Sequence, residues 1–529
     1  MSIWMRQRRR AAAVAAAIVL GAASPSLAAP FTLRKIIADT DPVPGAPGAI
    51  WDDFFPFFDT AVDGDGLAFV GHSHLQSLGR DGVYVYRGGS QPLQLIADSD
   101  QLRPGTGETF ANFWRVTMDG GVVAFTNQNL FTGLAGAYRH DGSGLQVIAD
   151  DRTVIPGKAH RFTTFGDIAV HDGAVLFGGG SEQEFAVWQQ EGLYLSAQGV
   201  LGAVVDSSTP IPGGSGSFDL VGEVGLEAGG FAFTRPRRNN TVDDGIYRNL
   251  GNGVEVVADL STVAPDSGVP FTNFRAFSRE AGATAFVAET AGRLAVYLAE
   301  DHGPLRPIAT VQTPYPGAGQ NFAGFSNRIA TSAGHVAFLG FWNPPNQFSR
   351  DGLFITNDTE LVKIIEEGAE LDGRVVNDIE LSQQAFDWPN LAFAVHFTDG
   401  SDALYLASFG NGCVPGSTSL CLQGSRFQVE LEWQSPPGFP GLRHAFVSPL
   451  STAQTGFFYF VGPENLELMA KVLDGCALNS HYWVFAAAAT NVEYTLKVTD
   501  TTTGTVREYH NVLGERSPAV NDTSAFLCP

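Results

Sequence analysis

The sequence predicts an all-β protein, a seven-bladed β-propeller of four-stranded blades followed by a C-terminal β-sandwich-like domain. Three observations predict this architecture. One block recurs seven times at steps of 51 to 59 residues, each block holds four short strand-like runs, and all four cysteines follow the last block. Four short strands at this spacing are typical of propeller blades.

The first 28 residues are expected to be a signal peptide. Four arginines precede a 13-residue apolar run from Ala11 to Ala23, and Ser26 and Ala28 fit the small residues of a cleavage site. The run is too short to span a bilayer, and no later segment is long and apolar enough. We therefore expect a secreted protein, periplasmic or extracellular, in which residues 29–410 form the propeller and residues 411–529 the C-terminal domain.

Each repeat is marked by Ile-Ala-Asp or a variant of it. A turn rich in proline and glycine follows, then two aromatics three residues apart, an Ala-Phe run and a Gly-x-Tyr run. The repeated aspartates are expected to cap turns, because aspartate accepts hydrogen bonds from backbone amides two residues on. The aromatic positions are expected to form the core between neighbouring blades. The tripeptides end at Asp39, Asp98, Asp150, Asp206, Asp259, Thr310 and Glu367.

The two ends of the repeat region complement each other. Residues 31–39 have the sequence of a fourth strand with no blade before them. The seventh block has its Ala392-Phe393 run and Tyr405, but no fourth strand follows. We therefore expect the N-terminal strand to complete the last blade, which closes the ring and removes an exposed sheet edge.

This combination of repeats resembles an uncharacterised repeat family of secreted bacterial proteins, over roughly residues 31 to 410. The resemblance implies the fold and the exported location, and it implies no activity. Residues 413–528 resemble a C-terminal module of many secreted bacterial proteins whose function is likewise unassigned. The matching pieces are LCLQGSRFQVELEW, KVLDGCALN, YWVF and TSAFLCP.

The four cysteines are expected to form two disulfides, because an exported chain with an even number confined to one segment favours a bonded domain. Four cysteines allow three pairings, and the sequence does not choose among them. Of the three we favour Cys413–Cys421 with Cys476–Cys528.

The net charge argues against two classes of partner. It is −23, and it becomes −27 once a signal peptide with four arginines and no acidic residue is removed. Such a surface repels phosphate backbones and anionic lipids, so nucleic acid and membranes are poor partners. The acidity is explained by solubility or by a calcium-dependent role; no other cofactor is expected, and we expect a monomer.

Motifs that carry chemistry are scarce. The sequence has no G-x-S-x-G, no H-E-x-x-H and no phosphate-binding glycine loop. His72 and His74 alternate so that both imidazoles face one side of a strand, which suits zinc, but no third ligand is evident and no metal site is predicted.

Charged residues follow the paired aromatics and change sign from block to block. On the innermost strands they would ring the channel mouth, where they could hold a polar ligand or form salt bridges between adjacent blades. These candidates are Asp59, Arg115, Asp167, Glu223 and Arg328.

The segments between the second and third strands vary most, from 11 to 17 residues, and they share one face with the links between blades. Variable loops on a rigid scaffold are where binding residues usually lie, although free drift of exposed loops also produces such variation. The candidate ligand-binding residues are Trp188, Arg235, Arg237, Arg238 and Trp342, together with His72 and His74.

The leading hypothesis is a secreted, non-enzymatic protein that binds a glycan or an extracellular protein on this loop-rich face. The C-terminal domain would provide attachment or a second contact. The first alternative is a polysaccharide lyase or glycoside hydrolase with its site at the channel mouth, and the second is a structural surface or matrix component. Clustered unlike ionisable groups at the channel mouth would favour the enzyme, and a dry channel filled by apolar side chains would favour the structural component.

Overall fold

The structure is a computed structural model. The signal peptide expected at residues 1–28 lies outside the residues that it describes. These are residues 31–52, 57–75, 78–88, 91–129, 133–181, 191–236, 243–301, 303–345, 349–356, 361–409, 413, 418–423, 426–434, 442–448, 450–452, 454–501, 503 and 505–528.

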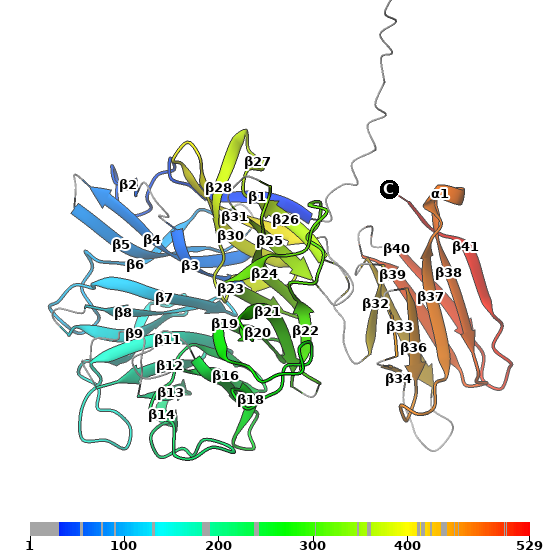
Figure 1. Cartoon of the computed structure of the whole chain (residues 1–529), viewed down its shortest axis with the longest axis horizontal. Helices are drawn as coiled ribbons and strands as arrows, with labels where there is room; N and C mark the ends of the chain where they lie inside the picture. Colours follow the sequence, from blue (N-terminus) through cyan, green and yellow to red (C-terminus); the bar gives the residue numbers. More distant parts are fainter. Residues whose placement is uncertain are drawn as a thin grey trace, which may run out of the picture.

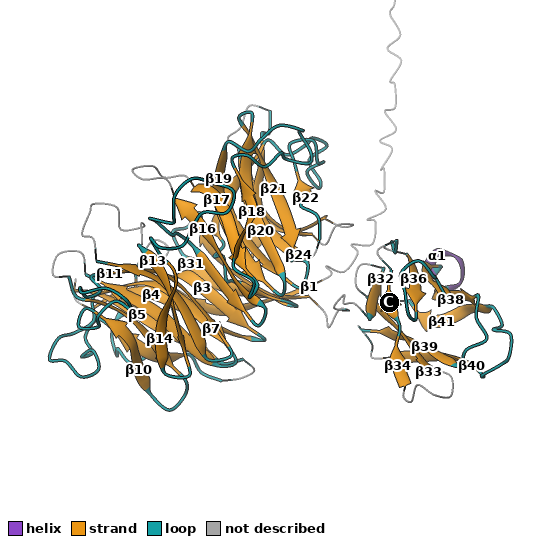
Figure 2. Ribbon diagram, turned by 90° about the horizontal axis from the view of Figure 1, so that it is seen from below, coloured by secondary structure: helices purple, strands orange, loops and turns teal. Residues whose placement is uncertain are grey.

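The described chain forms two lobes (Figure 1). Strands β1 to β31 lie in one lobe, and β32 to β41 with the four-residue helix α1 (Cys476–Asn479) lie in the other. Figure 2 shows that strands and loops make up almost all of both lobes. The all-β class predicted from the sequence is confirmed.

The first lobe consists of antiparallel sheets in which strands pair largely in chain order. The first two sheets contain β2 (Ile50–Trp51), β3 (Phe57–Asp63), β4 (Gly66–Leu75), β5 (Leu78–Tyr86) and β6 (Gln94–Asp98), then β7 (Asn112–Asp119), β8 (Val122–Gln128), β9 (Ala135–His140) and β10 (Leu145–Asp150). The next contains β11 (Thr164–His171), β12 (Ala174–Gly180), β13 (Gly192–Ala197) and β14 (Val200–Val205).

Two further groups of four strands are joined into one sheet by a single residue pair, Asp243 with Phe274. They are β15 (Val224–Glu227), β16 (Gly230–Pro236), β17 (Asp243–Asn249) and β18 (Val254–Asp259), then β19 (Asn273–Glu280), β20 (Ala283–Thr290), β21 (Arg293–Glu300) and β22 (Arg306–Ala309). The following sheet contains β23 (Gly324–Ser332), β24 (His335–Trp342), β25 (Arg350–Thr356) and β26 (Leu361–Glu366).

The last sheet of this lobe combines both ends of the repeat region. It contains β27 (Glu370–Leu371), β28 (Arg374–Glu380), β29 (Phe386–Asp387), β30 (Asn390–Phe397), β31 (Asp402–Phe409) and the N-terminal β1 (Phe31–Ala38). Seven residue pairs join β1 to β31, from Phe31 opposite Phe409 to Ala38 opposite Ala403. The N-terminal strand thus completes the last sheet, as the sequence predicts.

The hydrophobic cores lie between successive sheets. One cluster combines Val70 and Val83 of the first sheet with Phe113 and Tyr138 of the second. Within each group the aromatics also pack on one another, and the rings of Phe125 and Tyr138 stack with centroids 5.5 Å apart. The repeated aromatic positions are therefore core, as expected.

Four of the repeated aspartates cap their turns as predicted. The Oδ1 atoms of Asp98, Asp150, Asp206 and Asp259 each accept a hydrogen bond from the backbone N–H two residues on. Asp39 differs, because its carboxylate accepts a bond from the N–H of Asp402 across the closing strand pair.

The first strands of the sheets, here called the inner strands, contact one another in succession around an axis. β3 contacts β7, β7 contacts β11, and the series continues through β15, β19 and β23. It returns to β3 through β29 and β30. The lobe is therefore a closed, β-propeller-like ring of antiparallel sheets, many of them four-stranded.

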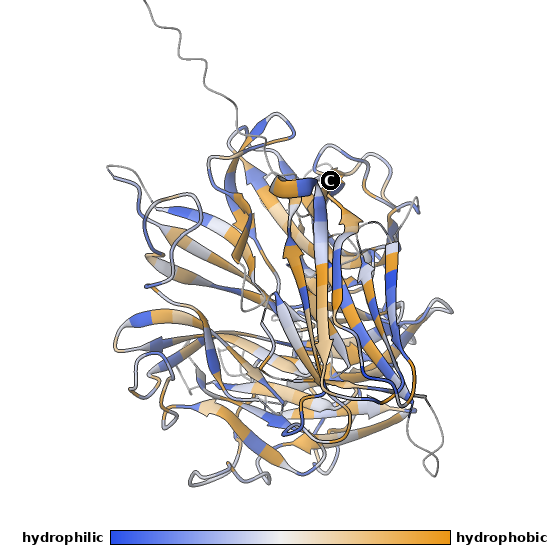
Figure 3. Ribbon diagram, turned by 90° about the vertical axis from the view of Figure 1, so that its right-hand side faces the viewer, coloured by the Kyte–Doolittle hydropathy of each residue, from blue (hydrophilic) through white to orange (hydrophobic). Residues whose placement is uncertain are grey.

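The second lobe has two five-stranded antiparallel sheets. Residues alternate between buried and more exposed along strands such as β33, and Figure 3 shows this alternation of hydrophobic and hydrophilic residues. The buried faces of both sheets share one hydrophobic cluster. The strands are β32 (Ser419–Leu422), β33 (Phe427–Gln434), β34 (Leu442–His444), β39 (Tyr494–Asp500) and β40 (Thr505–Asn511), and β35 (Phe446–Val447), β36 (Thr455–Tyr459), β37 (Leu468–Asp474), β38 (His481–Ala488) and β41 (Val520–Leu527).

The favoured disulfide pairing is confirmed. Cys413 bonds to Cys421 and Cys476 to Cys528, so all four cysteines are used.

Candidate functional site

The charged positions that follow the paired aromatics gather near the axis of the ring. Asp59, Arg115, Asp167 and Arg328 lie on inner strands, and Glu223 directly precedes β15. Each of the four strands carries a β-bulge at this point, where its pairing with the next strand shifts register. A bulge turns a side chain away from the sheet and is common beside functional sites.

Arg115 links the carboxylates of two other sheets. Its Nε lies 3.1 Å from Oδ1 of Asp167, and its Nη1 lies 3.8 Å from Oδ1 of Asp59. Asp59 and Asp167 also accept hydrogen bonds from the N–H groups of Val116 and Val224, each on the next sheet. These carboxylates therefore connect adjacent sheets, which is the structural role that the sequence left open.

Burial changes the acidity of these carboxyl groups. The pKa of Asp59 is raised to about 6 by burial, against the opposing effect of Arg115. Burial raises the pKa of Asp167 as well, again opposed by Arg115. Desolvation favours the neutral form of a carboxyl group, and the nearby guanidinium favours the charged form.

A second ion pair lies closer to the surface. Nη2 of Arg328 is 2.7 Å from Oε2 of Glu380 on β28, and the two side chains are 49% and 34% exposed. Burial raises the pKa of Glu380, and Arg328 opposes the shift. Glu380 was not among the residues predicted from the sequence, because the seventh block lacks the paired aromatics that mark the corresponding positions elsewhere.

These groups line a cavity of about 330 Å³, here called the arginine cavity. Trp114 forms part of its wall, and its indole Nε1–H donates to the carbonyl of Gln128 at 3.2 Å. The sequence analysis missed Trp114 too, because it directly follows the second aromatic, Phe113, and reads as one more core residue. The charged groups of the lining are Asp59, Arg115, Glu223, Arg328 and Glu380.

The arginine cavity opens on the side of the ring that carries the loops between second and third strands. Its lining residue Phe57 begins β3 and pairs with Gly71 of β4. β4 then continues to Leu75, where it turns into β5. The cavity and the predicted loop-rich face therefore lie on the same side.

A polar segment crosses the axis below the cavity. This axial segment, residues 381–385, links β28 to β29. Gln383 Nε2 donates to Oδ2 of Asp167 at 2.7 Å, and Gln384 Nε2 donates to the carbonyl of Ile168 at 2.8 Å.

The axial segment also bonds to other sheets of the ring. The Oγ of Ser382 accepts from the N–H of Thr60 at 2.9 Å, and the carbonyl of Gln383 accepts from the Oγ of Ser278 at 2.8 Å. Because it bonds to sheets on several sides, the axial segment separates the arginine cavity from a second cavity that Gln383 also lines. Gln383 and Gln384 of the axial segment therefore form a polar barrier across the axis of the ring.

The second cavity, about 70 Å³, is here called the acidic cavity. Its carboxylates stand at the ends of inner strands and mostly accept hydrogen bonds from turns of the next sheet. Asp63 accepts from the N–H of Gly121, Asp119 from that of Asp172, and Asp387 from that of Gly64.

Glu280 also lines the acidic cavity but makes no such bond within the described part of the chain. Its pKa is raised to about 8, by burial first and then by the neighbouring carboxylates of Asp387 and Glu227. His171 lies in the same cavity, with its Nδ1 3.6 Å from Asp119. The other acidic groups of this cavity serve to join the sheets.

The two predicted histidines form separate hydrogen bonds with two different carboxylates. His72 Nδ1 lies 2.5 Å from Asp81, and His74 Nδ1 lies 2.7 Å from Asp52. Both histidines lie on β4, and each is held by a different carboxylate.

Two more predicted ligand-binding residues end second strands on the loop-bearing side. Arg235 pairs with Asp244 at 3.1 Å and with Asp219 at 3.5 Å. Trp342 is half-buried, with its ring centroid 5.8 Å from that of Tyr315. Trp188, Arg237 and Arg238 lie outside the described residues, so the loop site stays a prediction.

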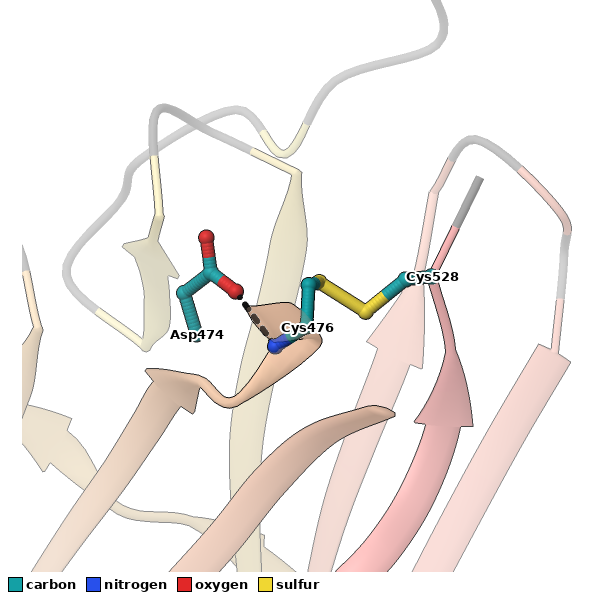
Figure 4. Close-up of side chains that lie close together, drawn as sticks. All are labelled: Asp474, Cys476 and Cys528. Atoms are coloured by element: carbon teal, nitrogen blue, oxygen red, sulfur yellow. Dashed lines mark hydrogen bonds between the residues drawn. A yellow bond between two sulfur atoms is a disulfide. The ribbon is translucent and has the colours of Figure 1, made fainter. Parts of the chain in front are cut away.

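In the part of the chain that the structure describes, one group of three close metal-ligating side chains occurs, and it is explained without a metal. The group is Asp474, Cys476 and Cys528. Figure 4 shows that the two cysteines form a disulfide and that Asp474 accepts a hydrogen bond from the N–H of Cys476, at 2.8 Å. Across the same described residues, no helix has the length and apolar character needed to cross a membrane.

The fold and its two axial cavities define a β-propeller-like protein. The chain belongs to DUF7453, a family of unknown function, whose model matches residues 28–409. No curated protein matches the chain in sequence.

Three solved structures are similar to the chain at low identity. One comes from a study of two prolyl endopeptidases, with a TM-score of 0.41 and 10% identity over 74% of this chain and 54% of that chain. This chain thus spans about half the length of that protein. The others are an oligogalacturonate lyase in complex with manganese (TM-score 0.39, 10% identity, 72% and 98% covered) and a GH74 xyloglucanase from Xanthomonas campestris (0.26, 12%, 94% and 99%).

Proposed function

We propose that this protein is a secreted, non-enzymatic glycan-binding protein whose site is the arginine cavity. In this proposal residues 29–410 form a seven-bladed propeller, and residues 411–529 form a β-sandwich that attaches the protein or makes a second contact. The single observation that carries the proposal is a half-open cavity of about 330 Å³ lined by unlike charges and a tryptophan, on the loop-bearing side.

The lining has the chemistry that sugars require. Carboxylates and guanidinium groups exchange hydrogen bonds with hydroxyls in fixed directions, and the face of an indole packs against the C–H groups of a pyranose ring. Ligand sites generally combine an enclosed shape with a few polar groups that set orientation. The β-bulges and the axial segment hold these groups in place before a ligand arrives, which lowers the entropic cost of binding.

The test is a glycan array with the mature secreted protein, followed by calorimetric titration of the best ligand. The double substitution Arg328→Ala with Glu380→Ala should weaken binding at least tenfold without lowering the melting temperature by more than a few degrees. Arg293→Ala, at an exposed position on β21, is the matched control and should leave affinity unchanged. If the wild-type protein binds no glycan on the array, the proposed function is wrong.

A second candidate function, a polysaccharide lyase or glycoside hydrolase, is favoured by one observation. Asp59, with a pKa of about 6, and Glu380, whose pKa is also raised, line the same cavity, and such carboxyl groups can serve as acid and base near neutral pH. Incubation of the array's best ligand with the protein, with and without calcium, should leave the glycan intact. Shortened or unsaturated products would replace the binding proposal by the enzyme.

A further inference from the structure

We infer that the glycan bound in the arginine cavity carries positive charge, so that its chemical class is an amino sugar with free amines. This inference rests on the proposed function and adds the ligand's charge to it. It is carried by the charge balance of the cavity, by the state of its two guanidinium groups and by its aromatic wall.

Carboxyl groups outnumber guanidinium groups at the cavity. Asp59, Glu223 and Glu380 line it, and Oδ1 of Asp167 lies 3.1 Å from Nε of Arg115. Two cations, Arg115 and Arg328, face these four acids. When all are ionised, the lining has a net charge of −1, and Asp167 beside Arg115 brings the cluster to −2. The field of a partly enclosed site is less screened than at an open surface. A ligand with an ammonium group lowers this charge on binding.

Both guanidinium groups are already held by carboxylates. Arg115 contacts Asp167 and Asp59, and its Nη1 also donates to the carbonyl of Trp114 at 3.4 Å. Arg328 contacts Glu380. A uronate or sulfated sugar would therefore meet arginines whose positive charge is already offset by carboxylates of the protein. An anionic ligand gains little from these arginines and is repelled by the excess of carboxylates.

The aromatic wall suits the same ligand. The indole N–H of Trp114 bonds to the carbonyl of Gln128, which fixes the orientation of the ring beside the cavity. A ring in this setting stacks on a pyranose and also attracts a cation through its quadrupole. Aromatic and acidic groups together thus favour an amine over an acetamide.

The shape of the site sets how the glycan enters. The axial segment bonds to strands on several sides of the axis and forms the floor of the cavity through Ser382 and Gln383. A chain therefore cannot thread through the ring, and it must approach from the loop-bearing side. The ligand is then short, or it is a longer glycan that inserts one end.

The experiment is calorimetric titration of the mature protein at pH 7 with three tetrasaccharides of matched length. They are a β-1,4-glucosamine oligomer, its fully N-acetylated form and an oligogalacturonate. We expect the free amine form to bind at least tenfold more tightly than the acetylated form, and the oligogalacturonate not to bind. The preference should shrink as salt is raised from 0.05 to 0.5 M.

The variant Glu223→Gln with Glu380→Gln tests the cause of the preference. It leaves two acids against two guanidinium groups, so the amine preference should fall below threefold and the oligogalacturonate should begin to bind. Glu370→Gln removes an exposed carboxylate on β27, away from the lining, and is the matched control that should keep the wild-type preference.

The outcomes separate the inference from the proposed function. Equal or tighter binding of the acetylated oligomer, or of the oligogalacturonate, overturns the inference and leaves glycan binding in place. Binding of a lysine tetrapeptide, with none of the three sugars bound, overturns the assignment to a glycan and with it the proposed function. Retention of the tenfold preference in the double variant also overturns the inference, since the charge would then come from elsewhere.

Discussion

Glu280 differs from the other acidic residues at the ends of the inner strands. Asp63, Asp119 and Asp387 each accept a hydrogen bond from a turn of the next sheet, so these carboxylates connect neighbouring sheets of the ring. Glu280 is surrounded by the same charges without such a bond in the described residues, and its pKa is raised to about 8. A carboxyl group in this state destabilises the fold once it is ionised.

We predict that Glu280→Gln stabilises the protein at alkaline pH and has little effect at acidic pH. Below the unfolded pKa of 4.5 the carboxyl is protonated in both states, and it costs nothing. Between 4.5 and about 8 the unfolded state ionises first, so stability falls as pH rises, and the loss is complete above about 8. The variant should therefore gain up to about 5 kcal/mol at pH 8.5, since one pKa unit corresponds to about 1.4 kcal/mol.

The measurement is urea unfolding of both proteins at pH 4 and pH 8.5. Glu300→Gln, on β21 and exposed, serves as the control and should show no such pH-dependent gain. An equal effect of Glu280→Gln at both pH values would mean that packing, and not ionisation, causes the change.

At the scale of elements, the axial segment stabilises the ring by contacting several of its sheets. Its side chains and backbone bond to β3, β11 and β19, which are far apart in sequence. Gln383 is central, because it satisfies one oxygen of the buried carboxylate of Asp167. Loss of a donor to a buried charged acceptor is costly, since the group stays desolvated.

We predict that Gln383→Ala destabilises the ring by about 1–3 kcal/mol, because Asp167 loses a charge-assisted hydrogen bond. Chemical unfolding followed by tryptophan fluorescence measures the change. Gln312→Ala, at an exposed turn, should be neutral within about 0.5 kcal/mol. A neutral Gln383→Ala would show that the axial segment is held by its backbone alone.

Only part of the fold and of the candidate site could be predicted from the sequence. Three features could be predicted because they depend on local or strongly periodic patterns. They are the aromatic core, the aspartate-capped turns and the pairing of the N-terminal strand with the last sheet. Asp59, Arg115, Asp167 and Glu223 were found because they stand at fixed distances from the paired aromatics. Glu380 and the axial segment were not, because no repeat marks them and their partners lie far away in the sequence. Gln383 and Asp167, for example, are 216 residues apart.

The β-bulges could not be predicted from the sequence for a related reason. A bulge depends on which residues pair across two strands, and one extra residue leaves the composition of the strand unchanged. Trp114 therefore reads as core from its neighbours, yet the register shift between Phe113 and Arg115 places it at the cavity.

At the scale of the whole molecule, closure of the first lobe depends on its N-terminal strand. β1 supplies seven residue pairs to β31, and Arg34 of β1 also donates to the hydroxyl of Tyr86, at 2.7 Å, on the first sheet. Deletion of residues 29–39 would expose the edge of β31 and break the ring at one point.

We predict that this deletion lowers the melting temperature of the first lobe by roughly 10 °C or more. The control is the mature protein, which lacks only residues 1–28. The measurement is differential scanning calorimetry. If the two truncated proteins melt alike, β1 contributes nothing to closure.

The two lobes have separate hydrophobic cores, and only the second contains disulfides. The cluster of the second lobe runs from Leu420 to Phe526, whereas the clusters of the first lobe end at Phe409. Cys476–Cys528 closes a loop with a sequence separation of 52, and Cys413–Cys421 one with a separation of 8. Because longer loops lose more entropy on cross-linking, the first of these bonds should stabilise the second lobe more.

We predict that calorimetry of the oxidised protein shows two transitions and that reduction lowers only the one belonging to the second lobe. The double substitution Cys476→Ala with Cys528→Ala should lower the free energy of unfolding of the second lobe by about 4 kcal/mol, and Cys413→Ala with Cys421→Ala by about 2.5 kcal/mol.

Thiol titration of the denatured, unreduced protein should find no reactive cysteine. A single transition that moves as a whole on reduction would show that the lobes unfold as one unit, and free thiols would show that the bonds do not form in the secreted protein.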